Sequence, residues 1–237
     1  MVMPTVILVR HGRSTANTSG VLAGRTPGVF LDDTGKTQVG RTGARLAAVP
    51  LAALVTSPLE RCRQTAQAIL DAQTTALTLI TEDGLLECDY GDWQNRKITD
   101  LTKEPLWTTV TDRPSRAVFP GGESLSAMQE RAVQAVRTHD AAVLEQCGQQ
   151  AVWAAVTHGD IIKSVIADAY GMPFDHFQRV HADPASVSII HYPENRDAAP
   201  HVLAVNTEDG ALAWLRPKMA KETTAEVGGG AGHYAAP

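Results

Sequence analysis

The chain has 237 residues, of which 43% are hydrophobic and 20% are charged. This composition is typical of a globular protein, and the length suffices for one well-buried α/β core or two small domains. The net charge of -5 argues against nucleic acid as a partner, because phosphate backbones attract basic surfaces.

Membrane and disulfide signals are weak throughout the sequence. Arg10 ends the first apolar run, which is too short for a signal peptide, and no later run approaches the roughly 18 apolar residues of a membrane span. The cysteines are odd in number and include no CxxC pair, so they predict neither a disulfide framework nor a zinc site. We therefore expect a cytoplasmic protein without a membrane partner.

The first third of the chain alternates between strand and helix patterns. The β-branched run Thr5–Val9 is typical of a strand buried on both faces. Leu31–Gly35 offers turn chemistry, and the spacing of small and apolar residues predicts a helix over Thr37–Ala48. Further strands are predicted at Leu54–Thr56 and Leu77–Ile80.

A helix start lies between the last two of these strands. Ser57 is a candidate N-cap, Pro58 would occupy the first helical position, and Glu60 follows the cap by three residues. This pattern predicts a helix that continues through Arg61 to about Ala72.

Periodicity fades between Asp89 and Phe119, where we expect an excursion that covers a site and contains a short helix near Ile98–Glu104. Gly121–Ser124 introduces a long helix to about Glu145. Trp93, Trp107 and Phe119 could line a substrate pocket there or pack within the excursion.

The last third of the chain returns to alternating patterns. Ala151–Thr157 predicts a buried strand and Ile161–Tyr170 a helix, stopped by a glycine and a proline. Ser186–His191 and His201–Asn206 resemble two late, antiparallel strands.

This alternation predicts a three-layer α/β/α sandwich, with a mostly parallel central sheet and helices on both faces. We expect a single catalytic domain over residues 1–216, with its capping excursion near 89–119. Residues 217–237 are small and polar and predict a disordered tail.

Polar residues follow three of the predicted strands. Arg10 and His11 come after the first strand, Arg61 lies in the first turn after the second, and His158 and Gly159 follow Ala151–Thr157. The carboxyl ends of parallel strands share one edge of a sheet, where ligands bind. Two guanidinium groups, two imidazoles and a helix N-terminus would suit a doubly charged anion there. An imidazole can also act as a nucleophile.

Each of these signals is weak alone, since a lone histidine is usually structural and a lone helical arginine usually lies on the surface. A metal site built on His176, His181 and Asp183 is an alternative, but no third histidine lies at ligand spacing. We therefore expect no metal and no cofactor. Glu123 could be a helix-start carboxylate, or could orient His158 or a substrate group.

The joint pattern resembles a known family. Arg10-His11-Gly12-Arg13-Ser14-Thr15-Ala16-Asn17 is similar to the Arg-His-Gly-x-Ser/Thr-x-x-Asn signature of the histidine phosphatase superfamily, the phosphoglycerate mutase-like proteins. Further segments resemble that family in the same order, namely Ser57–Ala66, Leu85–Trp93, Pro120–Ser124 and Thr157–Gly159. The resemblance spans Thr5 to Asn206.

This resemblance implies a role for each matching residue. His11 would be the nucleophile that becomes phosphorylated. Glu87 would protonate the leaving oxygen and then activate water, with Asp89 and Asp92 as alternative proton donors. The phosphoryl group would be held by Arg10, Arg61 and His158, with Asn17 at the pocket edge and Gly159 allowing close approach of a ligand to the backbone.

Phosphatases and phosphomutases of this family share the phosphohistidine step. Mutases usually carry Glu-Arg-His-Tyr-Gly where this chain has Glu87-Cys88-Asp89-Tyr90-Gly91, and their paired arginines correspond only to the separated Arg113 and Arg116. Both departures favour a metal-independent phosphomonoester hydrolase acting on a small phosphorylated metabolite. A phosphoglycerate mutase-like phosphomutase is the alternative, and a non-catalytic phosphate-binding module is a further one. The sequence is compatible with a monomer or a homo-oligomer.

Overall fold

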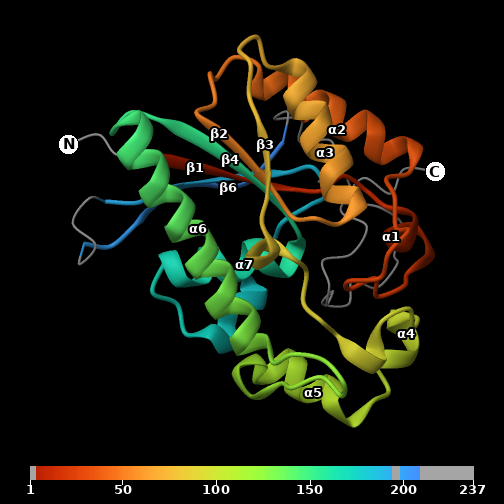
Figure 1. Ribbon diagram of the computed structural model, residues 1–237. Coiled ribbons are helices and arrows are strands. Elements are labelled where there is room, and N and C mark those ends of the chain that lie inside the picture. Colours follow the sequence, from red (N-terminus) through yellow and green to blue (C-terminus); the bar gives the residue numbers. More distant parts are fainter. Residues whose placement is uncertain (1–3, 194–197, 209–237) are drawn as a thin grey trace, which may run out of the picture.

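The computed structural model describes residues 4–193 and 198–208 (Figure 1), so the tail predicted over 217–237 lies outside the described residues. A central six-stranded sheet has the strand order β3-β2-β4-β1-β5-β6. The strands are β1 (Thr5–Arg10), β2 (Ala53–Thr56), β3 (Leu79–Thr81), β4 (Val152–Thr157), β5 (Val187–His191) and β6 (His201–Thr207).

The sheet is parallel on one side and antiparallel on the other. β1 pairs in parallel with β4, and β2 pairs in parallel with β4 and β3. β5 runs antiparallel to both β1 and β6. The predicted mostly parallel sheet and the predicted antiparallel end are therefore confirmed.

Helices surround this sheet and fill the connections between its strands. The α-helices are α1 (Thr15–Ser19), α2 (Asp33–Leu46), α3 (Glu60–Ala72), α4 (Ile98–Leu101), α5 (Pro105–Asp112), α6 (Leu125–Cys147) and α7 (Gly159–Ala169). Short 3₁₀ helices lie at Asp83–Leu85, Gly91–Trp93, Pro114–Arg116 and Phe174–Arg179.

Successive residues of β1 pack on opposite faces of the sheet, as the two-residue period of a strand requires. Val6 and Leu8 belong to a core that includes residues of α6 and α7. Ile7 and Val9 belong to a second core, with residues of α2 and α3. These two cores confirm the predicted three layers. Because both faces of β1 are covered, its sequence is apolar without alternation.

Two helix starts differ from the sequence prediction. Helix α2 begins at Asp33, before the predicted Thr37, because the side chain of Asp32 caps it by accepting a hydrogen bond from the Gly35 N–H at 2.7 Å. Helix α3 begins at Glu60 without a side-chain cap. The prediction that Ser57 caps this helix was wrong.

The excursion holds two helices where one was predicted. Helix α4 covers part of the predicted segment, and α5 follows at Pro105–Asp112. A proline inside a helix usually breaks it. Pro105 is tolerated because it lies in the first turn of α5, where its missing N–H would have no helical partner.

The aromatic residues of the excursion pack against each other. Trp93 and Phe119 are buried, with ring centroids 5.2 Å apart and edge-to-face. Trp107 stacks on Trp93 at 6.1 Å. Of the two interpretations of these aromatics, core packing is the correct one.

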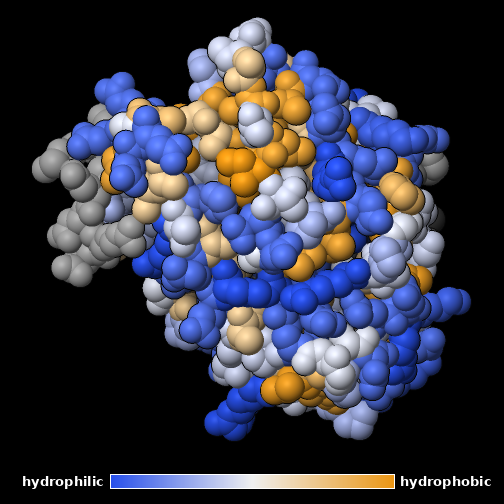
Figure 2. All heavy atoms as spheres, viewed as in Figure 1, coloured by the Kyte–Doolittle hydropathy of each residue, from blue (hydrophilic) through white to orange (hydrophobic). Residues whose placement is uncertain are grey.

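Figure 2 shows mostly hydrophilic residues on the viewed face, with apolar residues gathered toward the top. None of the helices in the described part of the chain is long and apolar enough to cross a membrane.

Two tight loops touch near the start of the excursion. Gly91 has a φ of +50°, and a Cβ built there would lie 2.1 Å from the carbonyl oxygen of Pro120 and 2.5 Å from the amide nitrogen of Gly122. Only a glycine allows this approach together with a left-handed backbone.

We expect Gly91→Ala to lower the free energy of unfolding by about 3 kcal/mol, the sum of left-handed strain and overpacking against backbone. Gly20→Ala is a matched control, since Gly20 has a φ of +63° with nothing within 4 Å of the added Cβ. It should lose only about 1 kcal/mol. Urea denaturation measures both values, and equal losses would contradict a steric cause.

Candidate active site

The three polar clusters predicted from the sequence meet at one edge of the sheet. β1 and β4 are neighbours, with Arg10 in register with Thr157, so His11 and His158 follow adjacent strand ends. β2 flanks β4 on its other side, and Arg61 lies in the first turn of the helix that follows β2. The expected convergence is therefore confirmed.

His11 is buried, and its hydrogen bonds fix its tautomer. Its Nδ1 lies 2.7 Å from the carbonyl oxygen of Gly12, which can only accept, so Nδ1 carries the proton. Its Nε2 accepts from Nε of Arg61 at 3.3 Å. Burial, followed by the charges of Arg61 and Arg10, lowers the pKa of His11 well below its usual value. The ring is thus neutral at physiological pH, with the lone pair of Nε2 directed toward Arg61.

Arg61 joins three parts of the site. Its Nη2 donates to the carbonyl oxygen of Gly24 at 2.8 Å and lies 3.2 Å from Nδ1 of His158. Its Nη1 is buried and has no hydrogen-bond partner among the described residues. A buried donor without an acceptor costs about 1–3 kcal/mol. Nη1 is therefore a ready donor for an anion.

His158 lies behind His11, with the ring centroids 5.3 Å apart and edge-to-face. Its Nε2 is 2.8 Å from Oγ of Ser57 and 3.4 Å from Sγ of Cys62. Burial, then the charges of Arg61 and other groups, lowers the pKa of His158 well below its usual value. Sequence reasoning missed Ser57, whose position directly after a buried strand was the available signal.

The remaining predicted phosphate ligands have different surroundings. Arg10 is buried and donates from Nη1 to the carbonyl oxygen of Ala182 at 2.7 Å. Asn17 accepts from the backbone N–H of Ser14 at 3.0 Å and so completes the capping box of α1, whose N-cap is Ser14. Gly159 is the first residue of α7.

These groups adjoin a small pocket that opens to solvent. Its walls are formed by His11, Ser14, Asn17, Val21, Leu22, Ala23, Gly24, Arg61, Glu87, Tyr90 and Ile98. Arg10, His158 and Gly159 are not among these residues. Of the three candidate acids, only Glu87 lines the pocket, whereas Asp89 lies 3.8 Å from Arg25.

Glu87 is only 3% exposed. Burial and then the charge of Asp160 raise its pKa to about 7, against the opposing effects of the Cys88 N–H and of Arg61 and Arg10. Asp160 is itself buried and accepts from the hydroxyl of Tyr90 at 2.7 Å. A substantial fraction of Glu87 is therefore protonated near neutral pH.

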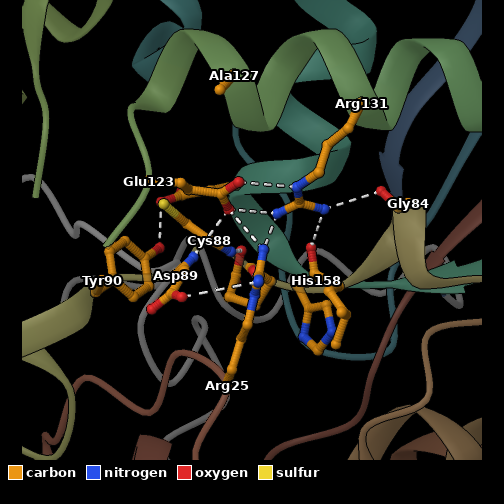
Figure 3. A network of polar contacts seen from close by, with 12 residues as sticks. Arg25, Gly84, Cys88, Asp89, Tyr90, Glu123, Ala127, Arg131 and His158 are labelled. Atoms are coloured by element: carbon orange, nitrogen blue, oxygen red, sulfur yellow. Dashed lines mark hydrogen bonds and ion pairs between the residues drawn. The ribbon is translucent and has the colours of Figure 1, made fainter. Parts of the chain in front are cut away.

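A second polar network holds the loop that carries Glu87 (Figure 3). Arg131 donates to the carbonyl oxygens of Gly84, Leu86 and Glu87 at 2.9, 2.7 and 3.1 Å. Arg25 donates to the same Glu87 carbonyl at 2.9 Å. Sequence reasoning missed both arginines, because no local pattern marks these long-range contacts.

Glu123 pairs with both of these arginines. Its carboxylate accepts from Arg131 at 2.6 Å, from Arg25 at 2.9 Å and from the Asp89 N–H at 2.9 Å. The N-cap of α6 is Ser124. Glu123 directly precedes this N-cap, as the prediction of a helix-start carboxylate requires. Its carboxylate hydrogen bonds go to Arg25, Arg131 and Asp89 rather than to His158, so the alternative in which it orients His158 was wrong.

The alternative metal ligands also have protein partners. Asp183 accepts from the amide of Asn206 at 2.9 Å and lies 3.0 Å from Nε2 of His181. Within the described residues, no group of three or more His, Cys, Asp or Glu side chains could hold a metal ion.

Comparison with known proteins agrees with this geometry. The model of the histidine phosphatase superfamily, branch 1, matches residues 6–206. The chain belongs to this superfamily. One relative is phosphoserine phosphatase 1 of Hydrogenobacter thermophilus. It is 30% identical to this chain over 200 residues, which cover 82% of this chain and 90% of the relative.

A probable phosphoglycerate mutase of Erwinia tasmaniensis is 26% identical over 196 residues, or 81% of this chain and 87% of the relative. The solved structure of a mycobacterial glucosyl-3-phosphoglycerate phosphatase superposes with a TM-score of 0.77 at 20% identity, covering 86% of this chain and 99% of the other. At that identity the superposition shows a shared fold.

The raised pKa of Glu87 predicts a pH-dependent effect on stability. The folded state binds this proton more tightly than the unfolded state, so ionisation of Glu87 destabilises the fold as the pH rises from about 4.5 to about 7. We therefore compare the free energy of unfolding of Glu87→Gln with that of the wild type at each pH. We expect this difference to favour the variant by roughly 2–4 kcal/mol more at pH 8 than at pH 5. Urea denaturation at both pH values measures this, and a pH-independent difference would contradict the shift.

Arg131→Met should reduce the rate of phosphate release from an alkyl phosphate by about tenfold or more. The loop that carries Glu87 would lose three hydrogen bonds from Arg131 to its carbonyl oxygens. Arg137→Met is a matched control on the same helix, where Arg137 pairs with Asp168 at 2.8 Å. Steady-state kinetics on both folded variants provide the measurement. Equal rates in the two variants would show that the network does not act through Glu87.

Proposed function

We propose that this protein is a phosphomonoester hydrolase that forms a phosphohistidine on Nε2 of His11. The observation that carries the proposal is that His11, Arg61 and the buried Glu87 line one pocket, and that Nη1 of Arg61 has no hydrogen-bond partner among the described residues. A nucleophile, a cation and an acid are the groups that transfer of a phosphoryl group to an imidazole requires.

In the first step, the hydrogen bond from Nε of Arg61 to Nε2 of His11 breaks, and the freed lone pair of Nε2 attacks phosphorus while the bond to the ester oxygen breaks. Negative charge spreads over the three equatorial oxygens, where Arg61 would stabilise it from the pocket wall. Arg10 and His158, which are not among the lining residues, would contribute once the phosphoryl group is bound. An alkoxide is a poor leaving group, so the proton of Glu87 passes to the departing oxygen and a neutral alcohol leaves.

In the second step, water attacks the phosphohistidine. The Glu87 carboxylate takes a proton from this water, the bond between nitrogen and phosphorus breaks, and Nε2 recovers its lone pair. Glu87 thus ends the cycle protonated, as it began. Arg10 and Arg61 supply the positive charge in this scheme, which requires neither a metal nor a cofactor.

A phosphomutase is the alternative, since relatives include a probable phosphoglycerate mutase. A mutase of phosphorylated acids must hold a second acidic group. Arg113 and Arg116 are exposed and do not line the pocket, which favours hydrolysis. The presence of His11, Arg61 and Glu87 in one pocket argues against a non-catalytic phosphate-binding module.

We also propose that the enzyme acts in the cytoplasm on a small phosphorylated metabolite. Cys62, Cys88 and Cys147 are free thiols, which fits a reducing compartment.

The mechanism predicts turnover of 4-nitrophenyl phosphate that EDTA leaves unchanged and that His11→Ala lowers by about 10³-fold or more. A rapid alkaline quench should trap the acid-labile phosphohistidine in the wild type and not in His11→Ala. Mutase activity is assayed in parallel with and without bisphosphoglycerate. Hydrolysis that survives His11→Ala would overturn the mechanism, and mutase activity far above hydrolysis would favour the alternative.

A further inference from the structure

The outer wall of the pocket is built from two segments that pair like short strands. The N–H of Leu22 donates to the carbonyl oxygen of Arg96 at 3.0 Å, and the N–H of Asn95 donates back to Leu22 at 2.8 Å. The N–H of Ile98 donates to the carbonyl oxygen of Gly20 at 2.9 Å, and Val21 bridges to Lys97. This pairing fixes the wall beside the catalytic groups.

The residues that this wall contributes to the pocket lining are apolar. Val21, Leu22, Ala23 and Ile98 line it, and Leu22 is almost fully buried. Arg61 is the one cationic side chain among the lining residues of the described structure, and its guanidinium faces His11 and His158.

Cations on or near these segments already have carboxylate partners. Arg25 pairs with Glu123 at 2.9 Å, and Arg96 pairs with Glu104. Lys97 is exposed and does not line the pocket. An acidic group on the leaving alcohol would therefore lose water against Val21, Leu22 and Ile98 without gaining a counter-charge, which is unfavourable.

We infer that the substrate is a phosphate monoester of an uncharged alcohol with an apolar part, rather than a phosphorylated acid. This inference rests on the proposed hydrolysis at His11. Each methylene that packs against the wall would tighten binding by up to about fourfold. A carboxylate in place of such a methylene would weaken substrate binding and so raise KM, because the leaving alcohol is the part of the substrate that contacts this wall.

The test compares 4-methylphenyl phosphate with 4-carboxyphenyl phosphate, which are similar in size and differ in charge. We expect kcat/KM to be about tenfold or more higher for the methyl ester, a difference of about 1.4 kcal/mol. Equal values, or a preference for the carboxylate, would overturn the inference while leaving hydrolysis intact. Failure to hydrolyse either ester, or 4-nitrophenyl phosphate, would instead overturn the proposed function, and the inference with it.

Two variants test whether the wall residues cause the preference for the uncharged ester. Ile98→Lys and Val21→Lys each add a cation, and each should raise kcat/KM for the carboxylate ester relative to the methyl ester by about fivefold or more. Leu203→Lys is the matched control, since Leu203 is 61% exposed on β6 and outside the pocket, and its ratio should not change. An unchanged ratio in both folded wall variants would overturn the inference.

Discussion

The site depends on holding positive charge beside neutral imidazoles out of contact with water. Arg61 is buried between His11 and His158, and Arg10 is buried next to His11. A buried charge is costly unless polar groups surround it. The carbonyl oxygens of Gly24 and Ala182 meet part of this requirement, and Nη1 of Arg61 is left to an incoming anion. Burial, together with these charges, keeps both rings unprotonated, so one arrangement would prepare the proposed nucleophile and the anion site together.

The acid requires the opposite balance within the same pocket. Arg61 and Arg10 favour an ionised Glu87, whereas burial and Asp160 favour its protonated form and have the larger effect. Backbone geometry makes this possible. Arg25 and Arg131 bind the carbonyl oxygen of Glu87 rather than its carboxyl group, so these cations position the acid without pairing with it. Glu123 offsets their charge from the far side of the network.

Local signals in the sequence were enough to predict the sheet and the convergence of Arg10, His11, Arg61 and His158. Strands buried on both faces are nearly continuous apolar runs, and the carboxyl ends of parallel strands lie along one edge of the sheet. Ser57, Arg25 and Arg131 were not predicted, because their partners lie far away in the chain. Ser57 also matches a helix-cap pattern, and that local interpretation concealed its contact with His158.

The position of Cys62 has a consequence for oxidative stress. Its sulfur lies 3.4 Å from His158, a place where a thiolate would be a competing nucleophile and a target for peroxide. Burial raises the pKa of this thiol to about 12. The sulfur therefore remains a thiol at cellular pH, which disfavours oxidation of a cysteine beside the candidate site.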